Sequence, residues 1–477
     1  MRARTALLTT VALVMAIACS DLKHADEDAP GGDDGGGATD GPVGGGDGAV
    51  DGGSGEDSGD AGPAPTDFEC AEPWTTATKT KTECAPRQVK IVDSDGRPDT
   101  EDISIAHTSA GRVAIAYYAP EFIDQGDMRL LHFIAANGSF TPTMITRPGS
   151  LALQAGYDVK LAASNPDTIH VLAHDVDDTT SGDVVAMKLV GGVEPLTDPE
   201  LVVAGVQQKT QLAFAADGAG NLYATALFRT GTKDGGGTLA KLVARKKLGA
   251  AAFASMPDVI TDLTPDEAPG VGATSLFVDG AGSLNLLYQF CDSQLSSQPR
   301  HHLFDGSNWS LRKTVDNASL DGFSGFSPRL AVSGTKKIAA YFYRKGGQST
   351  TATADLRVAT WSLASDMPAI EIVDQSIPSA DETAPRYRMA MAVDKFGLIH
   401  LAVVRPTTAN NASLEYVRQT RVAGGGTKWL SDTIDEEVLG VDQEAAVDIV
   451  VDENARPHIA YRSAADLKIR YATRYDR

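Results

Sequence analysis

Four arginines share a sequence position that suits them to hold an anion. Each lies at or just past the end of the second strand of a repeated unit. A guanidinium grips a carboxylate or phosphate through two parallel hydrogen bonds, so a cluster of these side chains would form a site for an acidic ligand. The alternative is that each is a solvated charge or pairs with a nearby aspartate such as Asp175, Asp178, Asp234 or Asp292. The four are Arg229, Arg344, Arg405 and Arg462.

Three histidines, His170, His400 and His458, occupy one equivalent strand position in three of the repeats. Equivalent positions in different repeats lie far apart unless they line a common axis, so these rings are poorly placed to share a metal ion. We expect each ring to pack between repeats with a ring nitrogen satisfied. We therefore predict no metal site and no cofactor.

No catalytic constellation stands out, and we assign no catalytic residue. Nucleotide-binding loops, a GxSxG elbow, an HExxH helix and an EF-hand loop are all absent. The acidic pairs Asp177-Asp178 and Glu436-Glu437 are available for glycoside hydrolysis, but that chemistry depends on carboxylate separations that a sequence does not show. The net charge of −21 argues against nucleic acid as a partner.

The strands that would position these residues recur seven times. Each copy has an apolar middle strand, a tight turn before it that often carries Asp and Gly, and a third strand after it. The fourth residues of the middle strands are 53 to 62 residues apart, which is typical of a β-propeller with four short strands per blade. They are Ala114, His170, Tyr223, Asn285, Ala339, His400 and His458.

The last copy is incomplete, because the chain ends soon after its third strand. Residues Gln88–Asp93 have the apolar-Asp ending of the fourth strands found in other copies. We therefore predict an all-β fold: one seven-bladed propeller over residues 67–477, whose N- and C-terminal strands share the last blade. Such closure removes the exposed strand edges that favour aggregation.

The N-terminal region has a different composition. Residues 1–18 have the arginines and the short apolar run of a signal peptide. The run ends in Ala16-Ile17-Ala18-Cys19, which fits either a signal-peptidase site or a lipobox in which Cys19 is acylated. Residues 19–66, rich in Gly and Asp, are predicted to be a disordered tether.

Three further cysteines follow. An exported protein meets an oxidising compartment, so we expect Cys70 and Cys84 to form a disulfide. Cys291 lies in an apolar strand and is expected to be a buried free thiol.

Together, the signal, the lipobox-like Cys19, the tether and the seven-fold repeat resemble exported bacterial lipoproteins that carry an uncharacterised β-propeller. The repeats are distantly similar to sialidase/BNR-type propellers, although the Asp-box of that group is absent. Its nearest piece, Phe304–Trp309, lacks the leading spacing. The resemblance implies fold class and location.

We predict a monomeric binding or interaction module outside the cytoplasm, held at the outer membrane or cell surface by its lipid. A soluble periplasmic or secreted protein is the alternative. Its partner would be an unidentified protein or glycan, bound on the long-loop face or at the axial mouth. One alternative is a carbohydrate-active enzyme, sialidase-like or another glycoside hydrolase or lyase, with carboxylates at the axial mouth. A structural cell-surface scaffold is the second.

Overall fold

The computed structural model describes β-strands and their turns between residues 88 and 473. Residues 1–87 are outside it, and with them the predicted signal peptide and tether, Cys19, Cys70 and Cys84. None of the described segments is a helix long and apolar enough to cross a bilayer. The described ranges are 88–93, 103–122, 125–134, 139–145, 154–164, 166–176, 181–191, 199–207, 212–232, 238–263, 271–291, 297–316, 322–345, 353–362, 367–378, 388–408, 411–421, 426–436, 438, 446–463 and 468–473.

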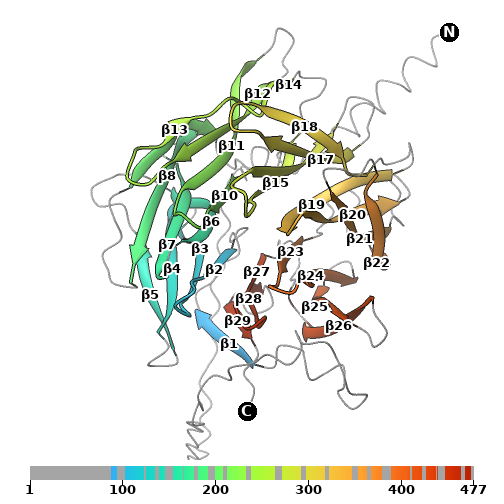
Figure 1. Ribbon diagram of the computed structural model, residues 1–477. Helices are drawn as coiled ribbons and strands as arrows, with labels where there is room; N and C mark the ends of the chain where they lie inside the picture. The colour runs from blue at the N-terminus through green and yellow to red at the C-terminus, as the bar shows by residue number, and fades with distance from the viewer. Residues whose placement is uncertain are drawn as a thin grey trace, which may run out of the picture.

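The strands form seven antiparallel blades around a central axis, with the first strand of each sequential unit innermost (Figure 1). Blades 1 and 2 are continuous through one parallel residue pair, Gly126 with Gln154, and blades 4 and 5 through another, Ser297 with Phe323. In blade 3, two short outer strands both pair with the third strand. The fold is therefore the predicted all-β propeller.

The bounds of the strands, blade by blade, are as follows. Blade 1 holds β2 (Ile103–His107), β3 (Val113–Phe122), β4 (Gln125–Ile134) and β5 (Ser139–Ile145); blade 2 holds β6 (Gln154–Ser164), β7 (Thr168–Val176), β8 (Ser181–Val190) and β9 (Glu200–Gln207). Blade 3 holds β10 (Leu212–Ala216), β11 (Leu222–Thr232), β12 (Thr238–Lys247), β13 (Ala254–Ser255) and β14 (Ile260–Leu263); blade 4 holds β15 (Val271–Val278), β16 (Leu284–Cys291), β17 (Ser297–Phe304) and β18 (Trp309–Thr314). Blade 5 holds β19 (Gly322–Ser333), β20 (Lys336–Lys345), β21 (Thr353–Ser362) and β22 (Ala369–Pro378); blade 6 holds β23 (Arg388–Val393), β24 (Ile399–Thr408), β25 (Asn411–Arg421) and β26 (Thr427–Asp435). Blade 7 holds β27 (Val447–Val451), β28 (Pro457–Ser463), β29 (Lys468–Thr473) and the N-terminal β1 (Gln88–Asp93).

The ring closes in blade 7. Strand β1 pairs antiparallel with β29, from Gln88 opposite Thr473 to Asp93 opposite Ile469, with a bulge between Ile91 and Asp93. The predicted closing strand and its partner are thereby confirmed. Because β1 covers β29, blade 7 has the same four-stranded form as its neighbours although its strands come from both ends of the domain.

The hydrophobic core lies between the blades. The described residues contain one apolar cluster in each of the seven gaps, including one between blades 7 and 1 that contains Ile103, Ile115, Tyr117, Ile469 and Tyr471. Alternating residues of each strand point to opposite sheet faces, so every blade contributes to two of these clusters. Burial of this apolar surface is what holds adjacent blades together.

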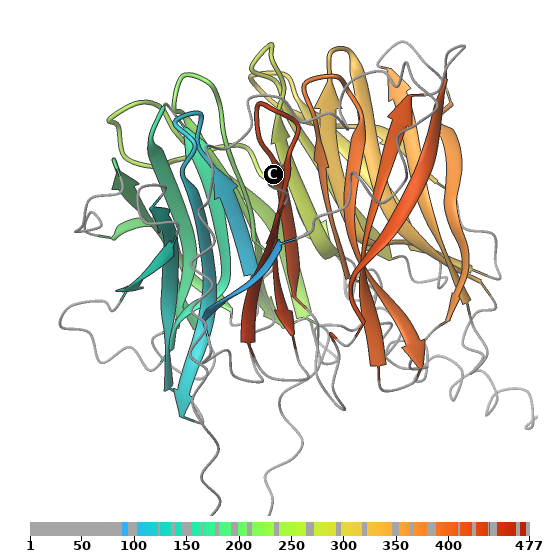
Figure 2. The same ribbon diagram turned by 90° about the horizontal axis from the view of Figure 1, so that it is seen from below.

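The turns between first and second strands use aspartate as the sequence suggested. In blade 3, Oδ1 of Asp217 accepts hydrogen bonds from the backbone N–H groups of Ala219 (2.9 Å) and Asn221 (2.8 Å). Gly220 has φ of +80°, a conformation open to glycine at little cost. Figure 2 shows these hairpin turns gathered on one face of the ring. We call it the short-turn face; the second strands end toward the opposite face.

Adjacent blades are also joined by a polar contact that recurs. In blade 5, Tyr341 and Arg357 are cross-strand partners, and both hydrogen-bond to Oδ2 of Asp316 from the end of blade 4 (2.9 and 2.8 Å). Blade 7 repeats the arrangement with Tyr461, Arg470 and Asp435 of blade 6. We call each set of three a Tyr-Arg-Asp clasp.

The clasps correct one detail of the repeat. If Tyr341 is equivalent to Tyr461, then the residue equivalent to His458 in blade 5 is Ile338, one position before the predicted Ala339. The cause is the turn before β20, where Ser333 pairs directly with Lys336 across Gly334 and Thr335. The other turns are longer, as in blade 4, where Val278 pairs with Leu284.

Candidate functional site

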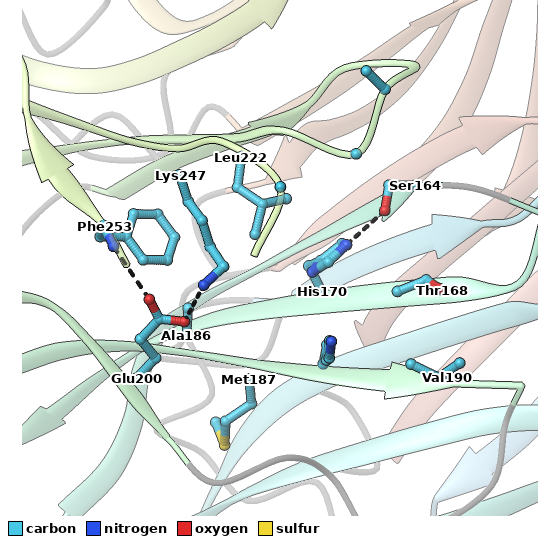
Figure 3. A pocket seen from close by; sticks show the side chains of 14 residues that line it. Ser164, Thr168, His170, Ala186, Met187, Val190, Glu200, Leu222, Lys247 and Phe253 are labelled. Atoms are coloured by element: carbon cyan, nitrogen blue, oxygen red, sulfur yellow. Dashed lines mark hydrogen bonds and ion pairs between the residues drawn. The ribbon is translucent and has the colours of Figure 1, made fainter. Parts of the chain in front are cut away.

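A pocket of about 350 Å³ opens between blades 2 and 3, on the short-turn face (Figure 3). Blade 2 lines it with the start of β7, the end of β8 and the start of β9. Blade 3 lines it with the start of β11, the end of β12 and the segment before β13. The volume is within the range of small-molecule sites, at its lower end.

On the blade 2 side, the key polar contact joins a serine to a histidine. Ser164 is the last residue of β6, and its Oγ lies 2.6 Å from Nε2 of His170 in β7. Burial, and next the charges of Lys188 and Lys247, lower the pKa of His170 to about 4. The ring is therefore neutral at pH 7 and can accept a proton or a hydrogen bond.

On the blade 3 side, Lys247 and Phe253 form the wall. Nζ of Lys247 lies 2.5 Å from Oε2 of Glu200 and 5.7 Å from the centre of the Phe253 ring. The other oxygen of Glu200 accepts a hydrogen bond from the backbone N–H of Phe253 (3.2 Å). These contacts fix the ammonium group and the aromatic ring on one side of the cavity, across from His170 in Figure 3.

The side chains that line the pocket have a net positive charge, whereas the whole chain has a net negative charge. Lys188 and Lys247 line it with one carboxylate, Glu200, and His170 is neutral. The net charge of the lining is therefore +1, in a protein with a net charge of −21. Fixed positive charge in a concave, half-enclosed surface favours an anionic ligand.

The four arginines predicted to bind an anion are in different environments. Arg344 in β20 and Arg462 in β28 are buried, with 0% and 1% of their surface exposed. Arg405 in β24 is more open and forms ion pairs with Glu415 (3.3 Å) and Asp374 (3.4 Å). Arg229 lies in β11, and its side chain is outside the described set, as is that of Cys291.

Of the three equivalent histidines, His400 has both ring nitrogens in contact with polar groups. Nδ1 lies 2.6 Å from Oη of Tyr416, and Nε2 lies 3.2 Å from Oδ2 of Asp394. His170 has Ser164 in the place of that aspartate. These two rings fit the expected packing role, although His170 also faces a pocket.

At the axis, polar groups of the innermost strands connect neighbouring blades. Oδ2 of Asp448 in blade 7 accepts hydrogen bonds from the N–H of Ile105 (2.9 Å) and from Oγ of Ser104 (3.2 Å), and that Oγ in turn accepts from the N–H of Leu161. Burial raises the pKa of the Asp448 carboxyl, against the opposing effect of the hydrogen bond from the N–H of Ile105. This carboxyl group is thus committed to hydrogen bonds that hold blades 7 and 1 together.

The sequence contains a weak signal for the pocket. Ser164 and His170 are six residues apart around a turn, the same spacing as Asp394 and His400. Lys247, Glu200 and Phe253, however, come from strand ends in two blades. Their proximity depends on how the outer strands of adjacent blades meet, which periodicity does not specify.

No protein-family profile and no curated protein sequence matches the chain. Solved structures with a similar fold include an ulvan lyase, a polysaccharide lyase bound to a chain of GlcA(1-4)Rha3S units. It has 12% sequence identity and a TM-score of 0.51, and the match covers 81% of this chain and 96% of the lyase.

Two other structures are less similar. An α-L-arabinanase of Penicillium chrysogenum complexed with arabinobiose has 11% identity, a TM-score of 0.45, and coverage of 82% of this chain and 98% of the arabinanase. A sialidase of Trypanosoma rangeli has 9% identity, a TM-score of 0.44, and coverage of 82% of this chain and 60% of the sialidase. All three similar structures are carbohydrate-active enzymes, and the likeness to the ulvan lyase shows a shared fold.

Proposed function

We propose that this chain is a carbohydrate-directed protein that holds an acidic sugar residue in the pocket between blades 2 and 3. The observation that carries the proposal is the reversed charge of that pocket, with Lys188 and Lys247 against the single carboxylate of Glu200. A carboxylated sugar brings one negative charge, which the lining accommodates and which most of this acidic protein surface would repel.

The uncharged groups of the pocket suit a sugar ring. Phe253 offers an aromatic surface, while Thr168, Ser164 and the neutral His170 offer hydrogen-bonding groups for hydroxyls. An apolar wall with a few placed polar groups is the usual composition of a small-molecule site. Acidic polysaccharides are the first ligand class to test because the ulvan lyase, which shares the fold, was solved with such a chain.

Catalysis is the second candidate, and the contact between Ser164 and His170 favours it. A neutral imidazole 2.6 Å from a hydroxyl can take its proton, or can remove a proton from a bound sugar. The alternative is a structural role for this contact, since Asp394 and His400 make the corresponding contact in blade 6.

Binding is tested with a panel of acidic and neutral oligosaccharides and the Lys188→Gln variant. Lys188 is exposed, so its replacement should preserve the fold and weaken binding of acidic sugars about tenfold. Lys246→Gln is the matched control, with the same loss of charge one residue away from Lys247 in β12 and outside the lining. Equal affinity for charged and neutral sugars, or equal weakening in both variants, would overturn the proposal.

The same panel separates the two candidates. Release of shortened or unsaturated sugars that is lost in Ser164→Ala and His170→Gln, with binding retained, indicates an enzyme. Binding without any product after prolonged incubation indicates a binding module.

The proposal includes a location outside the cytoplasm, with the chain tethered to a membrane through acylated Cys19. It follows from the signal peptide and the lipobox-like Ala16–Cys19. The Cys19→Ala variant should lose acyl mass and leave the membrane fraction. An unchanged membrane fraction contradicts the tether and leaves the pocket proposal untouched.

A further inference from the structure

Two histidines and an aspartate from opposite sides of the ring closure meet on the short-turn face. His107 ends β2 of blade 1, Asp452 lies in the turn before β28, and His458 lies in β28 of blade 7. One donor atom of each lies within 4.8 Å of a donor atom of both others. The rings of His107 and His458 are stacked, with centroids 5.1 Å apart.

His458 carries a nitrogen that has no hydrogen-bond partner. Its Nε2 is buried, and the nearest carboxylate oxygen, Oδ2 of Asp452, is 3.6 Å away, too far for a hydrogen bond. The side chain itself is only 8% exposed. A buried nitrogen without a partner is costly, and this one lies within reach of two further metal-ligating side chains, Asp452 and His107.

In blade 6, the equivalent aspartate and histidine, Asp394 and His400, form a direct hydrogen bond. There Nε2 of His400 lies 3.2 Å from Oδ2 of Asp394, within hydrogen-bond distance. In blade 7 the corresponding atoms are farther apart, and His107 of the next blade stands beside them. The difference is specific to the seam between the first and last blades.

We infer that His107, Asp452 and His458 form a zinc site that joins blades 7 and 1. Two imidazoles and a carboxylate are a common donor set for Zn²⁺, and three protein ligands leave a fourth position for water. Ligands around a tetrahedral zinc ion lie about 3.3 Å apart, so no pair of donors has to close by more than about 1.5 Å. His107 can supply this movement, since it ends its strand and is only partly buried.

The surrounding groups already orient two of the ligands. Nδ1 of His458 is hydrogen-bonded to Oη of Tyr471, which leaves Nε2 as the nitrogen for a metal ion. Oδ1 of Asp452 accepts from the N–H groups of Asn454 and Arg456 (both 2.8 Å), so Oδ2 is the oxygen that faces the histidines. Nε of Arg456 lies 3.8 Å from that Oδ2 and would compete with the ion.

Zinc titration of the purified full chain by calorimetry tests the inference. Two variants remove one donor each and preserve local structure: His107→Phe keeps a stacked ring, and Asp452→Asn keeps the Oδ1 acceptor. Each should weaken the one-to-one binding at least tenfold. Asp394→Asn, the same change in the equivalent turn of blade 6, should bind zinc as the parent does.

Removal of the competing Arg456 guanidinium should raise the affinity for zinc instead of lowering it. Arg456→Met should bind zinc at least threefold more tightly, and equal or weaker binding would place Asp452 outside the coordination sphere. Zinc at a hundredfold excess over Kd should also raise the melting temperature of the parent by about 3 °C, and not that of His107→Phe. The inference is wrong if zinc binding is unchanged in both donor variants, or if Asp394→Asn weakens it as much as they do. Neither outcome depends on what the pocket between blades 2 and 3 binds.

Discussion

Tyr461 lies directly opposite Arg470 across the β28–β29 ladder, and both side chains hydrogen-bond to Oδ2 of Asp435 in the preceding blade, at 3.0 and 2.7 Å. Burial, and next the charge of Asp435, raise the pKa of Tyr461, so its hydroxyl remains a donor across the physiological range. The clasp therefore links blade 6 to blade 7 with one neutral and one charged donor on a single oxygen.

Loss of the tyrosine hydroxyl should weaken this link measurably. We expect Tyr461→Phe to lower the free energy of unfolding by about 1.5 kcal/mol, the value of a hydrogen bond to a charged group. Urea denaturation of Tyr461→Phe, Asp435→Asn and the double variant gives the coupling energy between the two side chains. A coupling energy near zero would mean that the contact between Tyr461 and Asp435 does not stabilise the fold.

Removal of the closing strand should cost more. A chain that begins at residue 67 keeps β1 and is expected to melt as the full chain does. A chain that begins at residue 95 loses the five residue pairs between β1 and β29, or roughly 5 kcal/mol at about 1 kcal/mol for each lost hydrogen bond. It also exposes the edge of β29 and should aggregate. Thermal melts with light scattering measure both effects; identical melts for the two chains would refute the closure.

Stability should fall as the pH drops below about 6.5. Burial is the largest cause that lowers the pKa of His170, His174 and His302 to about 4 and that of His301 to about 3. The unfolded chain binds these protons first, so each histidine removes at most about 1.4 kcal/mol of stability per pH unit between pH 6.5 and 4.

The measurement is a series of melts between pH 7.5 and 4.5. His302→Gln is the comparison, since it removes one of these titrating rings and should flatten the decline. A melting temperature independent of pH across this range would contradict the buried, neutral state of these rings.

Two glycines with positive φ should respond differently to the same change. Gly325 has φ of +92°, and a Cβ atom there would lie 2.9 Å from the backbone N of Pro299 in blade 4. Gly334 has φ of +59° and open space around it. We expect Gly334→Ala to cost about 1 kcal/mol for its conformation alone, and Gly325→Ala about 3 kcal/mol because the backbone of another blade cannot move away. Similar losses would show that Pro299 gives way.

The sequence predicted the fold more completely than the site. Gln88–Asp93 was identified as the closing strand because its apolar-Asp ending matches strands elsewhere in the repeat, and the structure places β1 at those residues. The repeat pattern predicts the positions of strands well, because every blade packs against its neighbours in the same way. It failed by one residue at Ala339, where a shorter turn shifts the register.

The repeat pattern in the sequence did not predict the pocket or the cluster of His107, Asp452 and His458. The predicted ligand face was the long-loop face or the axial mouth, whereas the described pocket is on the short-turn face. His458 was compared with His170 and His400, its equivalents in distant blades. Its actual neighbour, His107, occupies a different position in the repeat, at the end of an innermost strand. Contacts between unlike positions of adjacent blades require the geometry of the ring.

The pairing of Gln88 with Thr473 has a consequence for how the chain reaches its folded state. The two residues are 385 positions apart, so β1, the first strand of the described residues, is among the last to find its partner. Long sequence separation slows folding, because the loop must close before its contacts form. Until β29 has been synthesised, β1 has no strand to pair with. The propeller can therefore become a finished ring only after β29 has been made.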